Sequence, residues 1–91
     1  MAAHAIIRVK GVVQGVGFRY YAHRKAMECN LTGYVKNNLD GSVETEVEGP
    51  REMIIAYLQA LKIGPAFSRV TDVNIEWLPF ENKFNEFRIT Y

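Results

Sequence analysis

The 91-residue sequence contains a single cysteine, Cys29, so the chain can form neither an internal disulfide nor a cluster of thiolate metal ligands. No segment approaches the roughly 18 to 20 apolar residues that a membrane-spanning helix needs. The N-terminus lacks the basic start of a secretory signal, and the net charge of +1 predicts no strong attraction to nucleic acid or anionic membranes. We therefore expect a cytoplasmic monomer with no metal, no cofactor, no nucleic-acid partner and no membrane association.

The composition is that of a globular chain. Apolar residues make up 48% of it and charged residues 23%, which excludes a disordered polypeptide. A chain of 91 residues is near the lower limit at which a hydrophobic core suffices without disulfides or metals. We expect one domain that spans residues 1–91.

The apolar residues recur with two different periods along the chain. Segments rich in β-branched residues or with strict alternation predict strands over residues 5–13, 32–36, 42–49, 70–78 and 87–91. A stripe with apolar residues three or four apart predicts a helix from Phe18 to Cys29, followed by Asn30 as a left-handed cap. A second such stripe predicts a helix with Pro50 as its first residue, ended by Gly64.

This order of elements favours an α+β fold of the ferredoxin-like type. We predict an antiparallel sheet with strand order 4-1-3-2, a short fifth strand at an edge, and two helices on one face. The first and second strands then run in the same direction, so their C-terminal ends meet at one edge of the sheet. This arrangement brings residues 11–19 close to Lys36 and Asn37.

The third predicted strand alternates between two kinds of side chain. Its core-facing positions are small or apolar, and the positions between them are Glu44, Glu46 and Glu48. We expect these glutamates to form a solvated face of the sheet. Neither histidine, His4 or His23, has a partner at metal-ligand spacing, so we assign neither a functional role. The aromatic residues Tyr57, Trp77 and Phe87 are expected in the core, together with Cys29.

The stretch GVVQGVGFRYY, Gly11 to Tyr21, leads from a strand through three glycines into a helix. Successive backbone N–H groups in such a turn, with the partial positive charge of a helix start, can bind an anion. Arg19 adds a planar fork of donors that matches phosphate oxygens. A Walker loop does not fit, because Gly17 is followed by Phe18 and Arg19 instead of lysine and serine or threonine. A dinucleotide fingerprint that starts at Gly15 does not fit either, because it needs glycine or alanine at Tyr20. A tight turn with Arg19 in a surface salt bridge is the plainer alternative.

Two longer motifs give these residues a resemblance to a known family. VKGVVQGVGFR (Val9 to Arg19) resembles the first signature of the acylphosphatases, and GYVKNNLDGSVETEVEG (Gly33 to Gly49) resembles their second. The similarity continues through GPAFSRVTDV to the last strand, so it covers essentially the whole chain. Three positions depart from the common pattern of the family: Ala22, Asn30 and Tyr34.

The resemblance implies metal-independent hydrolysis of acyl phosphates to a carboxylate and inorganic phosphate. Arg19 is then the main side-chain ligand of the phosphoryl group, and Asn37 positions the attacking water. The resemblance implies that the phosphoryl group lies against Gly11, Val13, Gln14, Gly15, Val16, Gly17, Phe18 and Arg19. The residues themselves agree with such a reaction: no nucleophile, general acid or magnesium-binding carboxylates accompany the loop, and a carboxylate leaving group with a pKa of about 4 needs none.

Three other functions share features with this sequence. An RNA-recognition domain shares the order of elements, but its third strand presents aromatic and basic residues where this chain has glutamates. Acylphosphatase-like domains also begin larger carbamoyl-transfer proteins, which continue into cysteine-rich zinc modules, whereas this sequence ends at Tyr91. The third alternative is a non-catalytic or regulatory domain that binds acyl or carbamoyl phosphate. A stand-alone enzyme is the favoured interpretation.

Overall fold

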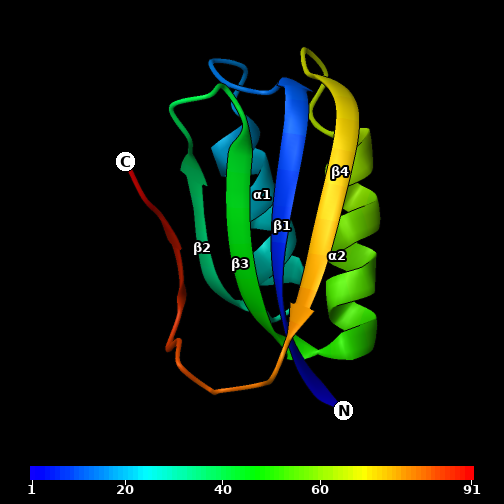
Figure 1. The fold of residues 1–91 in the computed structure, drawn as a ribbon, viewed down its shortest axis with the longest axis vertical. Coiled ribbons are helices and arrows are strands. Elements are labelled where there is room, and N and C mark those ends of the chain that lie inside the picture. Colours follow the sequence, from blue (N-terminus) through cyan, green and yellow to red (C-terminus); the bar gives the residue numbers. More distant parts are fainter.

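The structure is a computed structural model that describes residues 1–91. Its elements are β1 (Ala2–Val12), α1 (Phe18–Glu28), β2 (Thr32–Asn37), β3 (Val43–Pro50), α2 (Arg51–Ile63), β4 (Arg69–Leu78) and β5 (Phe87–Ile89). The five strands form one sheet in the order β4-β1-β3-β2-β5. Both helices lie on the same side of this sheet (Figure 1). The predicted ferredoxin-like fold and its strand order are therefore confirmed.

The sheet is mixed rather than wholly antiparallel. β1 pairs antiparallel with β3 and β4, and β2 pairs antiparallel with β3. β5 instead runs parallel to β2, with Phe87 opposite Gly33 and Ile89 opposite Val35. The reason is visible in Figure 1: after β4 the chain crosses one end of the sheet before it reaches the outer edge of β2. Neither helix is long and apolar enough to cross a membrane.

Several boundaries differ from the predicted ones, and β5, for example, ends at Ile89 rather than at Tyr91. Two of the differences, at the starts of β1 and α2, have a clear cause. β1 begins at Ala2, because Ala2 pairs with Pro50 at the end of β3. Pro50 is not the first helical residue: its φ of −58° suits a helix, but its ψ of 136° is extended, and α2 begins at Arg51. The predicted left-handed residue after α1 is correct, since Asn30 has a φ of 54°.

The core lies between the sheet and the two helices and comprises 15 buried apolar residues. α1 contributes Phe18, Ala22 and Ala26, and α2 contributes Ile54, Tyr57 and Leu61. Tyr57 and Phe87 are buried, as predicted. Cys29 and Trp77 are half-buried and pack against the rim of the core.

The expectation of a solvated glutamate face is wrong, because even the Glu44 side chain is only 13% exposed and the other two are buried. Glu46 is 6% exposed and Glu48 is 2% exposed, although both lie on the sheet face opposite the helices. The cause is the segment between β4 and β5, whose backbone caps Glu48. The Glu48 carboxylate accepts hydrogen bonds from the N–H groups of Glu81 at 2.7 Å, Asn82 at 2.9 Å and Lys83 at 2.7 Å.

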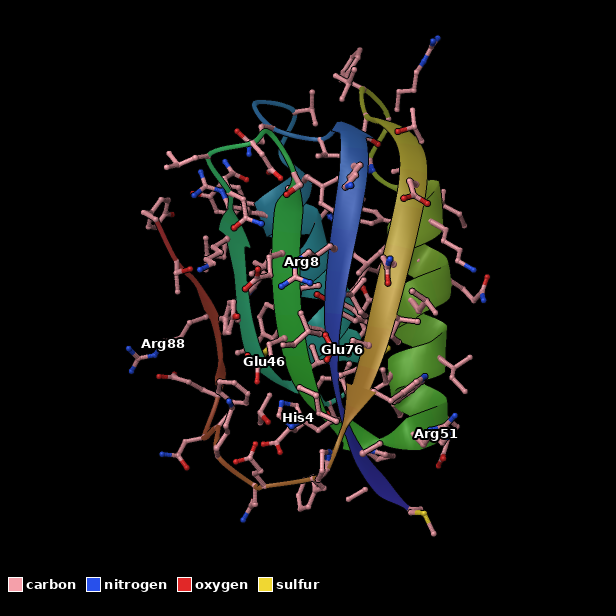
Figure 2. All side chains as sticks on the ribbon, in the orientation of Figure 1. His4, Arg8, Glu46, Arg51, Glu76 and Arg88 are labelled. Atoms are coloured by element: carbon pink, nitrogen blue, oxygen red, sulfur yellow. The ribbon has the colours of Figure 1, made fainter.

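The buried carboxylates form a cluster with His4 and Lys83, and Glu46 is at the centre of its second part. Its carboxylate contacts His4 Nε2 at 2.5 Å and Lys83 Nζ at 2.8 Å. His4 is fully buried, and its Nδ1 lies 2.9 Å from the carbonyl oxygen of Pro79. Figure 2 shows His4 and Glu46 close together near one end of the sheet. His4 therefore helps to fix the segment that follows β4, a structural role that the sequence analysis did not assign.

Acid is expected to destabilise the protein through this cluster. Burial alone raises the pKa of Glu48, but the three backbone N–H donors outweigh it and hold the pKa below its ordinary value of 4.5. A group whose pKa is lower in the folded state stabilises the fold above its unfolded pKa, and this contribution is lost as the pH falls through the folded pKa. We expect the free energy of unfolding, measured by urea denaturation, to decline below a pH of about 4.5.

The substitution Glu48→Gln isolates this contribution. It should lower the free energy of unfolding at neutral pH by about 1.5 to 3 kcal/mol, the range for hydrogen bonds to a charged group. The substitution should also make the free energy of unfolding fall less steeply as the pH is lowered. A variant that keeps both the stability and the acid slope of the wild type would contradict the role of Glu48.

Candidate active site

The turn between β1 and α1 leaves the start of α1 open to an anion. Gly17 is the N-cap residue, and no side chain caps the helix. The first turn also contains no acidic residue. The first N–H groups of a helix have no partner within the helix, and they carry its partial positive charge. This helix start therefore has the donors and the potential that a phosphoryl group requires.

Two glycines keep the turn open. Gly15 has a φ of 76° and Gly17 a φ of 78°, a backbone conformation that other residues rarely adopt. Apart from the adjacent residues, no atom lies within 4 Å of the place where either glycine would carry a Cβ. The absent side chains therefore leave free space next to the backbone, rather than making room for another part of the fold.

A pocket of about 110 Å³ lies at this turn. It is lined by Val13, Gly15, Gly17, Phe18, Arg19, Tyr20 and Asn37. Asn37 is the last residue of β2, and the turn follows β1. The predicted meeting of the ends of these two strands is thus observed: Arg19 and Asn37 line one pocket.

Asn37 presents a free acceptor. Its side-chain oxygen Oδ1 is buried and has no hydrogen-bond partner. Buried polar atoms are nearly always paired in folded proteins, so one without a partner in a pocket marks a place for a ligand or an ordered water.

The C-terminal residues hold the Arg19 side chain in place. Its Nη1 donates a hydrogen bond of 3.2 Å to the carbonyl oxygen of Thr90. Its guanidinium carbon lies 4.5 Å from the centre of the Tyr91 ring. Thr90 is itself held by its N–H group, which donates to the Val35 carbonyl oxygen on β2 at 2.8 Å. The guanidinium thus has a fixed position beside the pocket, with further N–H groups available to a ligand.

The structure does not place every predicted phosphate-binding residue at the pocket. Gly11, Gln14 and Val16 do not line it. Gly11 lies within β1, at an irregularity in the pairing with β4. Gln14 turns away to the β2–β3 connection, where its Nε2 donates to the carbonyl oxygens of Asn38 and Ser42, both at 2.8 Å.

Three residues at the site were not predicted from the sequence: Tyr20, which lines the pocket, and Thr90 and Tyr91, which contact Arg19. The position of Tyr20, directly after Arg19, was a usable signal. Nothing in the sequence set the register of β5 against β2, and this register brings the last two residues to Arg19.

Gln14 is expected to stabilise the turn against the β2–β3 connection. Gln14→Glu has nearly the same shape but lacks both N–H donors, and it places a carboxylate against two carbonyl oxygens. We expect the free energy of unfolding to fall by about 1 to 3 kcal/mol. Urea denaturation of this variant and of Gln14→Ala would measure the loss. Wild-type stability in both would show that the two hydrogen bonds contribute nothing.

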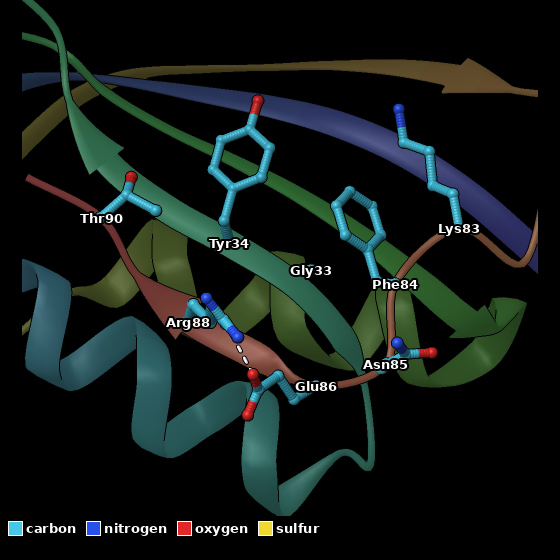
Figure 3. A pocket seen from close by; sticks show the side chains of 8 residues that line it. All are labelled: Gly33, Tyr34, Lys83, Phe84, Asn85, Glu86, Arg88 and Thr90. Carbon is cyan, nitrogen blue, oxygen red and sulfur yellow. Dashed lines mark hydrogen bonds and ion pairs between the residues drawn. The ribbon is translucent and has the colours of Figure 1, made fainter.

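A larger pocket, of about 270 Å³, lies beside β5 and is less suited to a phosphoryl group (Figure 3). It contains two cationic side chains, but each is already paired. Arg88 Nε lies 2.6 Å from Glu86, and Lys83 Nζ lies 2.8 Å from Glu46. The turn after β1 therefore remains the better candidate for an anion site.

The fold and the pocket together define a small ferredoxin-like domain whose β1 and β2 end at a pocket suited to an anion. Comparison with known proteins gives the family. The sequence profile of the acylphosphatases matches residues 5–89. An acylphosphatase of Thermus thermophilus is 49% identical over 69 residues, which are 76% of this chain and 78% of that protein.

Solved structures agree. The crystal structure of acylphosphatase from Bacillus subtilis superimposes with a TM-score of 0.92 and 41% identity over 100% of both chains. Full-length HypF, in its phosphate- and nucleotide-bound form, also superimposes with a TM-score of 0.92, at 29% identity, but this chain covers only 12% of it. The chain belongs to the acylphosphatase family.

Proposed function

We propose that the chain hydrolyses acyl phosphates without a metal ion, with the β1–α1 turn and Arg19 holding the phosphoryl group and Asn37 holding the attacking water. The observation that carries this assignment is that Asn37, whose buried Oδ1 has no hydrogen-bond partner, lines the same pocket as Arg19. A water that donates a hydrogen bond to this oxygen lies next to the place of a phosphoryl group. The amide is neutral, so it does not repel the anionic substrate as a carboxylate would.

The chemistry needs few protein groups. No carboxylate, imidazole or thiol lines the pocket. The water oxygen forms a bond to phosphorus, the bond from phosphorus to the acyl oxygen breaks, and its electron pair leaves on the carboxylate. The proton of the water passes to a non-bridging phosphoryl oxygen, so the products are a carboxylate and dihydrogen phosphate. Arg19 and the N–H groups of the turn stabilise the charge on the phosphoryl oxygens.

The proposed partners are small molecules only: an acyl phosphate as substrate and inorganic phosphate as product. We propose that the enzyme acts as a monomer in the cytoplasm. The single cysteine, Cys29, is half-buried and has no second cysteine in the chain to form a disulfide with. The chain therefore needs no oxidising compartment, and a reducing one suits it.

The proposed function is tested by phosphate release from benzoyl phosphate in the presence of excess EDTA, above the uncatalysed rate. We expect rapid turnover that the chelator does not change. Binding of inorganic phosphate without turnover would instead indicate a non-catalytic or regulatory domain. Activity that disappears with EDTA and returns with a divalent cation would contradict the metal-independent mechanism.

A further inference from the structure

We infer that Tyr20 forms the subsite for the acyl group and gives the enzyme a preference for acyl phosphates whose acyl group is flat and apolar. This inference rests on the proposed function. It concerns the part of the substrate that neither Arg19 nor Asn37 holds.

The direction in which the acyl group leaves the pocket follows from the position of Asn37. In phosphoryl transfer the attacking and leaving oxygens lie roughly in line on opposite sides of phosphorus. The water lies at Asn37, so the acyl oxygen lies on the far side of the phosphoryl group. Val13 and Phe18 are each 1% exposed and close the pocket on the side of the core. The acyl group therefore extends toward the open side.

Tyr20 is the large side chain on that open side. Of the residues that line the pocket, Gly15, Gly17 and Tyr20 are exposed, and the two glycines have no side chain. Tyr20 is 67% exposed, so its ring is accessible to an acyl group. An acyl group that leaves the pocket by this side meets the Tyr20 ring.

A second ring extends the apolar wall. The Tyr20 hydroxyl is the main cause of a raised pKa at Tyr91, so the two hydroxyl groups lie near each other. The Tyr91 ring also covers the Arg19 guanidinium, 4.5 Å from its centre. The rings of Tyr20 and Tyr91 thus form an apolar surface directly beside Arg19, the side chain that binds the phosphoryl group. Arg19 is the only charged residue that lines the pocket, so a charged acyl group finds no partner beyond it.

The test compares two probes that share the phosphoryl end, benzoyl phosphate and acetyl phosphate. For Tyr20→Ala we expect kcat/KM for benzoyl phosphate to fall about 3- to 10-fold, the value of one aromatic contact, while that for acetyl phosphate changes less than about 2-fold. The inhibition constant of inorganic phosphate should not change. Tyr20→Phe keeps the ring and should retain the benzoyl preference.

The matched control is Phe80→Ala, which removes another exposed aromatic ring. Phe80 follows β4 at the end of the sheet where β1 begins, far from the turn that follows β1. This control should leave both substrates unaffected. An equal fall for the two substrates in Tyr20→Ala, or no change in either, would overturn the inference while leaving the proposed function intact. A wild type that hydrolyses neither substrate would refute the proposed function itself, and the inference with it.

Discussion

Replacing Asn37 with alanine is expected to lower kcat for benzoyl phosphate by about 100-fold or more, while the inhibition constant of inorganic phosphate changes little. The variant loses the one buried acceptor that can fix the water, and a poorly placed reactant costs about two orders of magnitude in rate. The ligands of the phosphoryl group, Arg19 and the N–H groups of the turn, stay in place. Steady-state kinetics with phosphate as a competitive inhibitor separates the two effects.

The neighbouring amide supplies the control for this experiment. Asn38 does not line the pocket, and its Nδ2 donates to Ser42 Oγ at 3.0 Å within the β2–β3 connection. Asn38→Ala should keep kcat within about 3-fold of the wild type, because it leaves the water site untouched. If Asn37→Ala lost its phosphate affinity and kept its rate at saturation, the water-positioning role would be wrong.

The second large effect is expected for Arg19→Lys, which should weaken the binding of inorganic phosphate by about 1.5 to 3 kcal/mol, or roughly 10- to 100-fold. One guanidinium nitrogen is committed to the Thr90 carbonyl oxygen, and the others remain for phosphoryl oxygens. A lysine ammonium is a single point charge, so it cannot bind the Thr90 carbonyl oxygen and the phosphoryl oxygens in the same geometry. Calorimetric titration with phosphate would measure the loss.

Arg24→Lys is the matched control, because Arg24 lies on the same helix but forms an exposed ion pair with Glu28 at 4.0 Å. It should bind phosphate as the wild type does. A phosphate affinity in Arg19→Lys equal to that of the wild type would remove Arg19 from the phosphoryl site. Far-ultraviolet circular dichroism of each variant would show that the fold is retained.

The sequence predicted the strand order and the meeting of Arg19 with Asn37 because both depend on short-range patterns. Hydrophobic periodicity sets the elements, and right-handed crossovers limit the ways of joining them. The two strands that carry the motifs then necessarily end together. The position of the Asn37 side chain in a pocket with Arg19 follows from the same topology.

The burial of Glu46 and Glu48 could not be predicted from such patterns. Alternation in β3 separates two faces of the sheet, but it does not say what covers the second face. The segment after β4 has no periodicity of its own, so its path across Glu46 and Glu48 could not be predicted. Its anchor is the set of three N–H groups on Glu48, a contact between residues more than 30 positions apart. The parallel direction of β5 follows from the same path.

The short strand β5 has a consequence for the behaviour of the protein at high concentration. β5 is three residues long, and it covers the outer edge of β2, where the Gly33 N–H donates to the Glu86 carbonyl oxygen. An uncovered strand edge is a template for strands of other molecules and hence for aggregation. Resistance to edge-to-edge assembly on this side of the sheet therefore depends on a few hydrogen bonds near the C-terminus. Conditions that detach β5 also withdraw Phe87 from the core, and they expose the unpaired edge of β2.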